Sequence, residues 1–305
     1  MLLKHDIAGD PMTELKWTHK TPQKVAELLQ QHGIAVCANT VARLLYSMDY
    51  SLRVNHKCLA NSAPERNQQF DFISHLRGRF ERQSWPIISV DSKKKEQLGK
   101  FKNPGRKWDQ QAQRVNDHDF RSLASGIAIP YGVYDLLANR GSVFVGISHD
   151  TPAFAAHSIA GWWQQEGARR YRHAGKLLIL ADSGGSNGYR CRAWKMELQT
   201  KLANRFGLTL TVAHYPAGTS KWNPIEHRLF SEISKNWAAE PLDSYDKILN
   251  FIRTTKTNTG LTVSAYLDSN AYPTGITPDE ETLHQLRLRH HNTLPALNYT
   301  ISPKM

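Results

Sequence analysis

The sequence predicts an α/β fold in which a mixed sheet is flanked by helices and is preceded by a small all-α domain. Three observations lead to this prediction. Residues before about 85 show helical periodicity only, whereas strand-like and helical segments alternate after that point. Two of the strand-like segments are continuously apolar, which is typical of strands buried inside a sheet. Hydrophobic residues make up 40% and charged residues 22% of the 305 positions, as in ordinary globular proteins.

Charge is the unusual feature of the composition. The chain has 39 Lys and Arg against 27 Asp and Glu, a formal net charge of +12. Such an excess favours a polyanionic partner, either nucleic acid or an acidic membrane surface. Residues 77–107 hold 10 basic and 3 acidic side chains, and residues 169–205 hold 9 and 2. This concentration in two short segments favours nucleic acid.

The cysteines and the apolar residues exclude other classes of protein. Cys37, Cys58 and Cys191 are too far apart for a disulfide framework or a zinc site, so we expect a reducing compartment. No run of about 18 apolar residues occurs that could span a membrane. The sequence therefore predicts a cytoplasmic protein without a membrane partner.

Residues 1–60 are predicted to form a helix-turn-helix DNA-binding region. Thr21 and Pro22 are a typical helix start, and Gly33 ends the apolar periodicity that follows. A second short helix would begin after Asn39 as its cap. Two short helices joined by such a turn form a helix-turn-helix.

The second of these helices is the predicted DNA-reading element. Its exposed face would carry Thr40, Arg43 and Ser47. A small strand over residues 51–55 would make the domain winged. The alternative is a helical hairpin that only packs. A connecting helix over residues 61–84 would follow, with an apolar face on one side and arginines on the other.

Residues 85–260 are predicted to form the main domain. We expect strands at 87–91, 127–137, 142–148, 176–182 and 208–214, and helices at 153–166, 189–206 and 223–237. A long loop would cover residues 97–125, and residues 261–305 would be a C-terminal extension. The order strand, hairpin, helix, strand, helix, strand, helix is that of a ribonuclease-H-like fold.

Three carboxylates are candidate catalytic residues in this domain. Asp91 and Asp182 each end an apolar strand, where parallel sheets place their ligands. Glu226 lies in the first turn of a predicted helix, on the stripe that faces the sheet. If the two strands are neighbours, the three side chains converge at one edge.

Three grouped carboxylates suit two Mg²⁺ or Mn²⁺ ions, which need hard oxygen ligands. Two such ions about 4 Å apart can activate an attacking oxygen and stabilise the leaving oxygen of a phosphodiester. Each carboxylate has an alternative role: Asp91 could simply open a turn, and Asp182 could begin a flexible or phosphate-cradling loop. Glu226, three residues after Asn223, could belong to a capping box.

Several longer motifs resemble a known family. They are Ile88-Ser89-Val90-Asp91-Ser92-Lys93-Lys94-Lys95-Glu96, Phe101-Lys102-Asn103-Pro104-Gly105-Arg106, Ile129-Pro130-Tyr131-Gly132-Val133-Tyr134-Asp135, Leu180-Ala181-Asp182-Ser183-Gly184-Gly185-Ser186-Asn187-Gly188, Gly218-Thr219-Ser220-Lys221-Trp222-Asn223-Pro224-Ile225-Glu226-His227-Arg228-Leu229-Phe230 and Pro273-Thr274-Gly275-Ile276. Through them the chain resembles the DDE transposases of bacterial insertion sequences, in particular the ISAzo group of the retroviral-integrase-like superfamily.

This resemblance implies a catalytic and metal-binding triad of Asp91, Asp182 and Glu226. It implies cleavage at transposon ends and transfer of the freed strand into target DNA. The implied partners are double-stranded DNA, as terminal inverted repeats and target, and a second copy of the chain in a homodimer or larger assembly at the nucleoid. Members of this group usually carry more sequence ahead of the helix-turn-helix, so we expect a truncated copy or a start further upstream.

Residues beside the triad are candidate DNA contacts. They are Lys93, Lys94, Lys95, Lys221, Trp222, Asn223 and Arg228. Asp150 is the alternative second metal ligand. The triad chemistry alone leaves open a nuclease or junction resolvase on the same fold, and a truncated, inactive copy that only binds DNA is a further alternative.

Overall fold

The computed structural model describes residues 8–9, 16–17, 19–52 and 64–304. The chain divides into two compact units, residues 1–59 and 60–305. In the described part of the chain, no helix combines the length and the apolar character needed to cross a membrane.

The first unit contains the two predicted short helices. A two-stranded ribbon of β1 (Ala8–Gly9) and β2 (Lys16–Trp17) precedes α1 (Pro22–Gln31) and α2 (Ala38–Ser47). The start of α1 is confirmed, because the Thr21 hydroxyl accepts a hydrogen bond from the backbone N–H two residues inside the helix.

The predicted start of α2 is wrong. The cap is Cys37 rather than Asn39, because the backbone is still extended at Cys37 (φ −86°, ψ 161°) and turns helical at the next residue. The predicted wing is not formed at Ser51 and Leu52, and residues 53–55 lie outside the described residues.

The second unit is built on one large mixed sheet. Its strands are β3 (Ile87–Ser92), β4 (Glu96–Leu98), β5 (Gly126–Asp135), β6 (Arg140–Gly146), β7 (Lys176–Ala181), β8 (Thr209–His214), β9 (Thr262–Asp268), β10 (Leu288–His290) and β11 (Asn298–Ile301). Their order is β10-β11-β8-β7-β3-β5-β6-β9, with β4 paired to β5. β3, β7 and β8 run parallel, and β5 runs antiparallel to β3. The ribonuclease-H-like fold class is confirmed.

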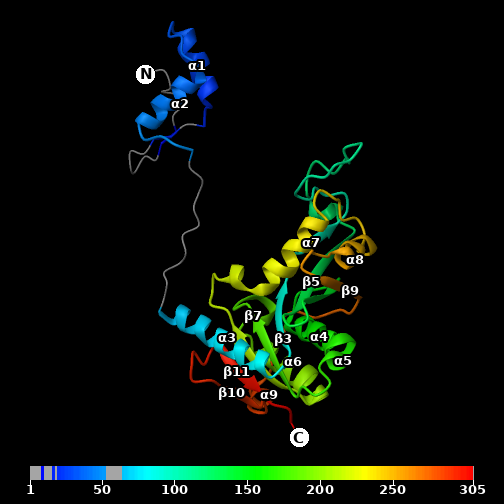
Figure 1. The fold of residues 1–305 in the computed structure, drawn as a ribbon. Coiled ribbons are helices and arrows are strands. Elements are labelled where there is room, and N and C mark those ends of the chain that lie inside the picture. Colours follow the sequence, from blue (N-terminus) through cyan, green and yellow to red (C-terminus); the bar gives the residue numbers. More distant parts are fainter. Residues whose placement is uncertain (1–7, 10–15, 18, 53–63, 305) are drawn as a thin grey trace. The chain divides into compact units, whose positions relative to one another are not determined.

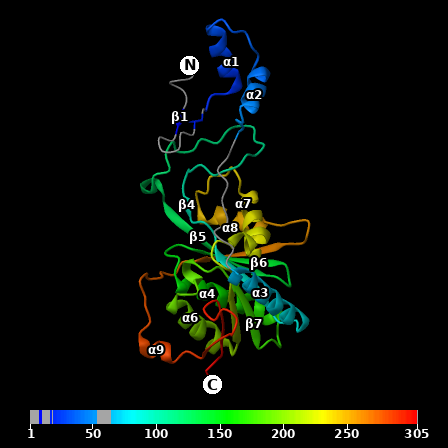
Figure 2. The ribbon, with the colours of Figure 1, turned by 90° about the vertical axis from the view of Figure 1, so that its left-hand side faces the viewer.

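Helices cover both faces of this sheet (Figure 1). They are α3 (Pro64–Arg82), α4 (Pro152–Trp162), α5 (Ala168–Arg170), α6 (Arg192–Leu198), α7 (Ser231–Asn236), α8 (Tyr245–Thr254) and α9 (Glu280–His284). α4 and α6 pack on one face, and Figure 2 shows them across the sheet from α3. On the second face, α3 packs against β7 and β8, whereas α7 and α8 pack against β5, β6 and β9.

Three of the helices are extended by π-helical turns. These are η2 (Trp163–Gly167), η4 (Gln199–Asn204) and η6 (Glu226–Phe230). The last one joins the start of a helix at Pro224 to α7, so a single helical segment covers residues 224–236. Single π-helical turns inside helices often occur at functional sites.

The C-terminal residues belong to the same sheet, which the sequence did not reveal. β9 pairs in parallel with β6 at one edge, and β11 pairs antiparallel with β8 near the other. Between β4 and β5, the predicted long loop is interrupted only by the short 3₁₀ turn η1 (Arg121–Leu123) in its described residues. The strands before residue 261 therefore depend on residues after it for their pairing.

A buried amide pair fixes α3 on this sheet. The Gln69 Nε2 donates to the backbone oxygen of His214 on β8 and to Oδ1 of Asn298 on β11, both at 2.8 Å. Asn298 Nδ2 donates back to Gln69 Oε1 at 2.6 Å. Gln69 and Asn298 are fully buried, so water cannot replace these hydrogen bonds.

We expect Gln69→Ala to lower the free energy of unfolding by about 1–3 kcal/mol, because Oδ1 of Asn298 and the backbone oxygen of His214 both lose a buried donor. Urea unfolding would measure this change. Gln68→Ala is the matched control, because Gln68 is the exposed neighbour on the same helix. Equal stability of the two variants would contradict the assigned role of the amide pair.

Candidate active site

The strand pairing brings the two predicted aspartates to one edge of the sheet. β3 and β7 are adjacent and parallel, with Val90 opposite Ala181. Asp91 and Asp182 are the next residues of each chain segment, so both carboxylates lie where the two central strands end. Both side chains are only partly exposed.

Glu226 reaches this edge from the helical segment over residues 224–236. The segment packs directly on β5 at Gly132, which is the partner of Asp91 in the ladder. A Cβ at Gly132 would stand 2.6 Å from a Phe230 ring carbon and 2.8 Å from the Ile225 side chain. The close approach of helix and strand therefore depends on a residue without a side chain at this position.

A buried serine connects the strand of Asp91 to the helix of Glu226. The Ser89 hydroxyl donates to Oδ1 of Asn223 and accepts from the backbone N–H of Ile225 at 3.2 Å. Ser89 and Asn223 are both fully buried. The first turn of the helix is therefore attached to β3 two residues before Asp91.

Asp182 is held by two hydrogen-bonding groups. Its Oδ2 accepts from the Ser220 hydroxyl at 2.9 Å. Its backbone oxygen lies 2.8 Å from Nδ1 of His214, and because a carbonyl oxygen only accepts, Nδ1 carries the proton. Burial lowers the pKa of His214 to about 4, so the ring is neutral. Its Nε2 then accepts from the Tyr299 hydroxyl at 3.0 Å.

Repulsion couples the three carboxylates. Burial and the charges of Asp182 and Glu226 raise the pKa of Asp91 to about 8, against hydrogen bonding from the Ser92 N–H. Burial also raises the pKa of Asp182, and burial together with Asp182 raises the pKa of Glu226. Such mutual shifts require that the charges lie close to one another in a partly desolvated place.

The chemistry of this donor set fits a divalent cation. All three groups are hard oxygen ligands whose repulsion a bound cation would relieve. In the described part of the chain, no three His, Cys, Asp or Glu side chains stand close enough together to hold an ion jointly. Asp91, Asp182 and Glu226 are therefore close enough to repel one another, but in this structure they do not all surround one ion position.

Of two other carboxylates considered for the site, Asp150 lies beside these three and Asp135 lies apart from them. Asp150 accepts from the Ser92 hydroxyl at 3.0 Å and adds to the charge that Asp91 experiences, so it remains nearby. Asp135 lies at the other end of β5 and is fully buried. It accepts hydrogen bonds from Tyr171 and Arg170, so its role is structural.

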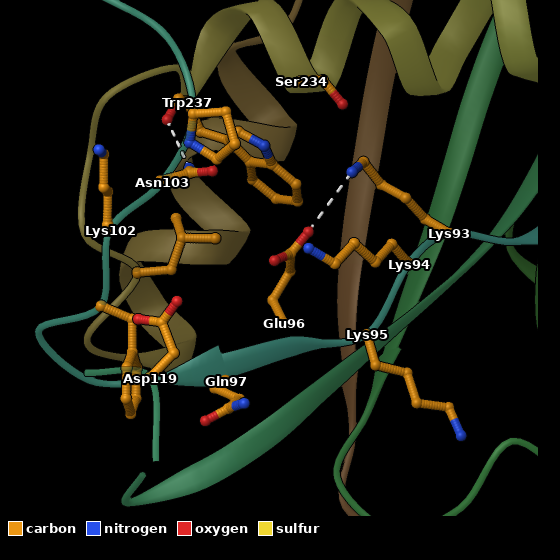
Figure 3. Close-up of a pocket in the computed structure, with 13 residues that line it drawn as sticks. Lys93, Lys94, Lys95, Glu96, Gln97, Lys102, Asn103, Asp119, Ser234 and Trp237 are labelled. Carbon is orange, nitrogen blue, oxygen red and sulfur yellow. Dashed lines mark hydrogen bonds and ion pairs between the residues drawn. The ribbon is translucent and has the colours of Figure 1, made fainter. Parts of the chain in front are cut away.

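The lysine run after Asp91 lines a pocket of about 300 Å³ beside the site (Figure 3). Lys93, Lys94 and Lys95 come from the strap between β3 and β4, and Lys102 from the loop that follows. The Lys93 Nζ lies 4.6 Å from the centre of the Trp237 ring and 3.6 Å from a Glu96 oxygen. Its charge also acts on Glu226.

Other predicted DNA-contacting residues surround the start of the Glu226 helix. Trp222 is 40% exposed, and two cations lie over its ring, Lys221 at 4.1 Å and Arg66 of α3 at 4.9 Å from the ring centre. Arg228 is exposed, whereas Asn223 is fully buried against Ser89. Asn223 is therefore not accessible to DNA, unlike the exposed residues of this group.

The capping box that was the alternative for Glu226 is not formed, because the Asn223 side chain bonds Ser89 instead. In the first unit, Arg43 and Ser47 are exposed on α2 and Thr40 is partly exposed. The Thr40 hydroxyl is 3.3 Å from the Cys37 sulfur. These three side chains keep the arrangement on one helix that the sequence predicted.

Three supporting residues were missed in the sequence: Ser89, Ser220 and Gly132. The only signal in the sequence was their position inside the family motifs: Ser89 in that of Asp91, Ser220 in that of Glu226, and Gly132 in the separate motif over residues 129–135. Their partners lie far along the chain, 134 positions away for Ser89 and Asn223 and 38 for Ser220 and Asp182. Such contacts become visible only once the strands are paired.

Comparison with known proteins gives one match along almost the whole chain. A family model described as Rhodopirellula transposase DDE domain matches residues 1–303. A search of proteins with curated functions found no match.

Solved structures of Mos1 transposase are also similar. They include a paired-end complex with the left transposon end (16% identity, TM-score 0.46), a pre-cleavage transpososome (16%, 0.47) and a strand transfer complex (16%, 0.46). Each match covers 76% of this chain. The chain spans 64 to 66% of the length of these proteins.

We expect Ser89→Ala to lower the free energy of unfolding by about 1–3 kcal/mol, because the Asn223 carbonyl and the Ile225 N–H both lose a buried partner. Chemical denaturation would measure the loss. Ser74→Ala, at an exposed position of α3, is the control. A Ser89→Ala variant as stable as this control would show that the serine does not attach the helix to β3.

We expect Gly132→Ala to push the helical segment over residues 224–236 away from β5 and to cost about 1–3 kcal/mol of stability. A crystal structure of the variant would show the displacement of Glu226. Gly175→Ala is the control, because a Cβ at Gly175 meets no atom within 4 Å. An unmoved Glu226 in the Gly132 variant would contradict this account of the close packing.

Proposed function

Because the chain belongs to the family of the Rhodopirellula transposase DDE domain, we propose that it cleaves DNA at transposon ends and transfers the freed strand into target DNA. The family predicted from the sequence motifs is thereby confirmed. The single observation that supports the proposed chemistry is the parallel pairing of β3 with β7, which places Asp91 and Asp182 at one edge of the sheet beside Glu226.

We propose that these three carboxylates hold two Mg²⁺ or Mn²⁺ ions. When bound, such ions activate an attacking oxygen and stabilise the leaving oxygen of a phosphodiester. The role of the protein is to position the ligands. Ser220 fixes one oxygen of Asp182. Ser89 fixes the helix start from which Glu226 extends, and Gly132 lets that helix approach.

The cationic surfaces beside the carboxylates are the proposed path of the DNA. Lys93, Lys94 and Lys95 would contact backbone phosphates next to the cleaved bond. On the other side, Lys221, Trp222 and Arg228 would contact the strand that enters the site. Trp222 would offer a ring face to an unstacked base, as aromatic side chains do in proteins that process single strands.

The first unit would supply sequence recognition. We propose that α2 contacts the terminal inverted repeats through Thr40, Arg43 and Ser47. Since a transposable DNA element has two ends, we propose that the protein acts as a homodimer or larger assembly on the DNA. The place of action would be the cytoplasm, at the nucleoid.

We expect Asp91→Asn, Asp182→Asn and Glu226→Gln each to reduce metal-dependent strand cleavage by more than about 100-fold, the upper end of what loss of a residue that only supports a metal ligand costs. DNA binding should persist, and chelation of the metal should stop cleavage in the unchanged protein. Gel analysis of nicked, labelled duplexes would measure both activities.

Asp150→Asn is the matched control, because this carboxylate shares the electrostatic surroundings of Asp91 but is not a proposed ligand. We expect it to retain cleavage. Loss of cleavage in this variant together with retention in Asp182→Asn would transfer the role of second ligand to Asp150.

The attacking group distinguishes a transposase from a nuclease or resolvase on the same fold. Incubation of pre-cut transposon ends with a target plasmid and Mg²⁺ should give joined products through attack by the 3′-hydroxyl. Hydrolysis without any joined product would favour the nuclease. DNA binding without strand breaks, with or without metal, would favour the inactive copy.

A further inference from the structure

A second basic site lies far from the three carboxylates, on the face of the sheet that α3 covers. It is a small pocket of about 110 Å³ at the amino-terminal ends of β7 and β8. Three cations from different elements line it: Arg79 from α3, Lys176 from β7 and Arg289 from β10. Residues more than 200 positions apart in the sequence therefore meet at one small pocket.

These cations are not neutralised by the protein. In the described part of the chain, none of the three forms an ion pair, and no carboxylate lines the pocket. Glu81, on the same helix as Arg79, forms its ion pair with Arg77 and not with Arg79. The Lys176 Nζ lies 4.4 Å from the centre of the Trp85 ring, an arrangement that limits its freedom without cancelling its charge.

The side chain of His291 is a fourth basic group in this pocket, and its pKa shows that the cations lie close to one another. His291 lines the same pocket, and its pKa is lowered by burial and by repulsion from Arg289, Arg79 and His290. Its Nε2 lies 2.7 Å from the Thr300 hydroxyl. The positive charges from α3 and from the C-terminal strands thus act on one another in a place that is partly shielded from solvent.

The remaining polar groups in the pocket are neutral hydroxyls. Thr209 and Thr211 on β8 and Thr300 on β11 line its wall. Hydroxyls donate hydrogen bonds to anionic oxygens, and arginine side chains bind phosphate with two parallel N–H groups. The pocket thus offers unpaired cations, hydroxyl donors and room for one small group. These properties suit a single tetrahedral anion.

We propose that this pocket binds a backbone phosphate of DNA at a place remote from the cleaved bond. Lys176 begins β7 and Asp182 directly follows its last residue, so the two lie about 20 Å apart at about 3.3 Å per residue. This distance corresponds to about six base pairs. The proposal rests on the proposed function, because DNA is taken as the ligand.

The test is the salt dependence of DNA binding by the full chain. Arg79→Gln combined with Arg289→Gln removes two of the cations, both of which are exposed at the pocket rim. Arg172→Gln combined with Arg205→Gln is the matched control, because these arginines are also exposed and do not line the pocket. Fluorescence anisotropy of a labelled linear duplex, measured over a series of salt concentrations, gives the slope of log affinity against log salt.

Each lost phosphate contact should reduce the magnitude of this slope by about 0.9. We expect a reduction of about 1–2 in the pocket variant and none in the control, with unchanged thermal unfolding in both. An unchanged slope in a pocket variant that is folded would overturn the proposed site. An equal reduction in both variants would also overturn it, because it would indicate diffuse attraction to surface charge.

The proposed function fails in a different way. It fails if the unchanged chain shows no metal-dependent cleavage, whatever the slope of binding. Asp91→Asn provides the internal check, since it should bind DNA with the slope of the unchanged chain while losing cleavage. A pocket that binds an acidic protein instead of DNA would leave the DNA slope unaltered in the pocket variant, and so counts against the proposal.

Discussion

Electrostatic repulsion among three carboxylates is the constraint on which the rest of this structure depends. Desolvated like charges raise each other's pKa, and here the pKa of Asp91 rises to about 8. Without other constraints, the three carboxylates would move apart, because like charges repel. The parallel pairing of β3 with β7 fixes the two aspartates next to each other, and the hydrogen bonds of Ser89 fix the approach of Glu226. The fold thus keeps the three carboxylates close together despite their repulsion, and a bound cation would replace this repulsion by attraction. Functional sites commonly contain such unfavourable arrangements.

The basic side chains complement this arrangement from outside the carboxylate edge. The charge of Lys93 offsets part of the rise in the pKa of Glu226, yet Lys93 is paired with Glu96 and lies over the Trp237 ring. It therefore moderates the repulsion without occupying the space between the carboxylates. Lys94 and Lys95 are exposed on the same strap. Negative and positive groups are kept in separate, adjacent zones, which is the arrangement that a phosphate backbone held beside cations requires.

Much of the site could be predicted from local patterns, and the remainder depends on pairing between distant segments. Asp91 and Asp182 follow continuous apolar strands, and Glu226 lies on an apolar helical stripe, so short windows of sequence were enough to place them. Ser89 and Gly132 carry no such local signal, because their importance comes from Asn223 and Phe230 on a distant helix. β9 and β11 were missed because their sequences, Thr262–Asp268 and Asn298–Ile301, mix polar and apolar residues and have no continuous apolar run like those of β3 and β7. The cap of α2 was misplaced because Cys37 lacks the side-chain oxygen of a typical cap.

The position of β11 has a consequence for how the protein is made. Its Tyr299 supports the His214 ring that in turn holds the backbone of Asp182, and its Asn298 anchors α3. Both residues are synthesised after all three carboxylates. Until they are made, β8 lacks its antiparallel partner β11, and the support behind Asp182 is incomplete. The edge that carries the carboxylates is therefore incomplete when Glu226 has just been made, and a nascent chain interrupted before β11 would have an unpaired edge of β8 and an unsupported Asp182.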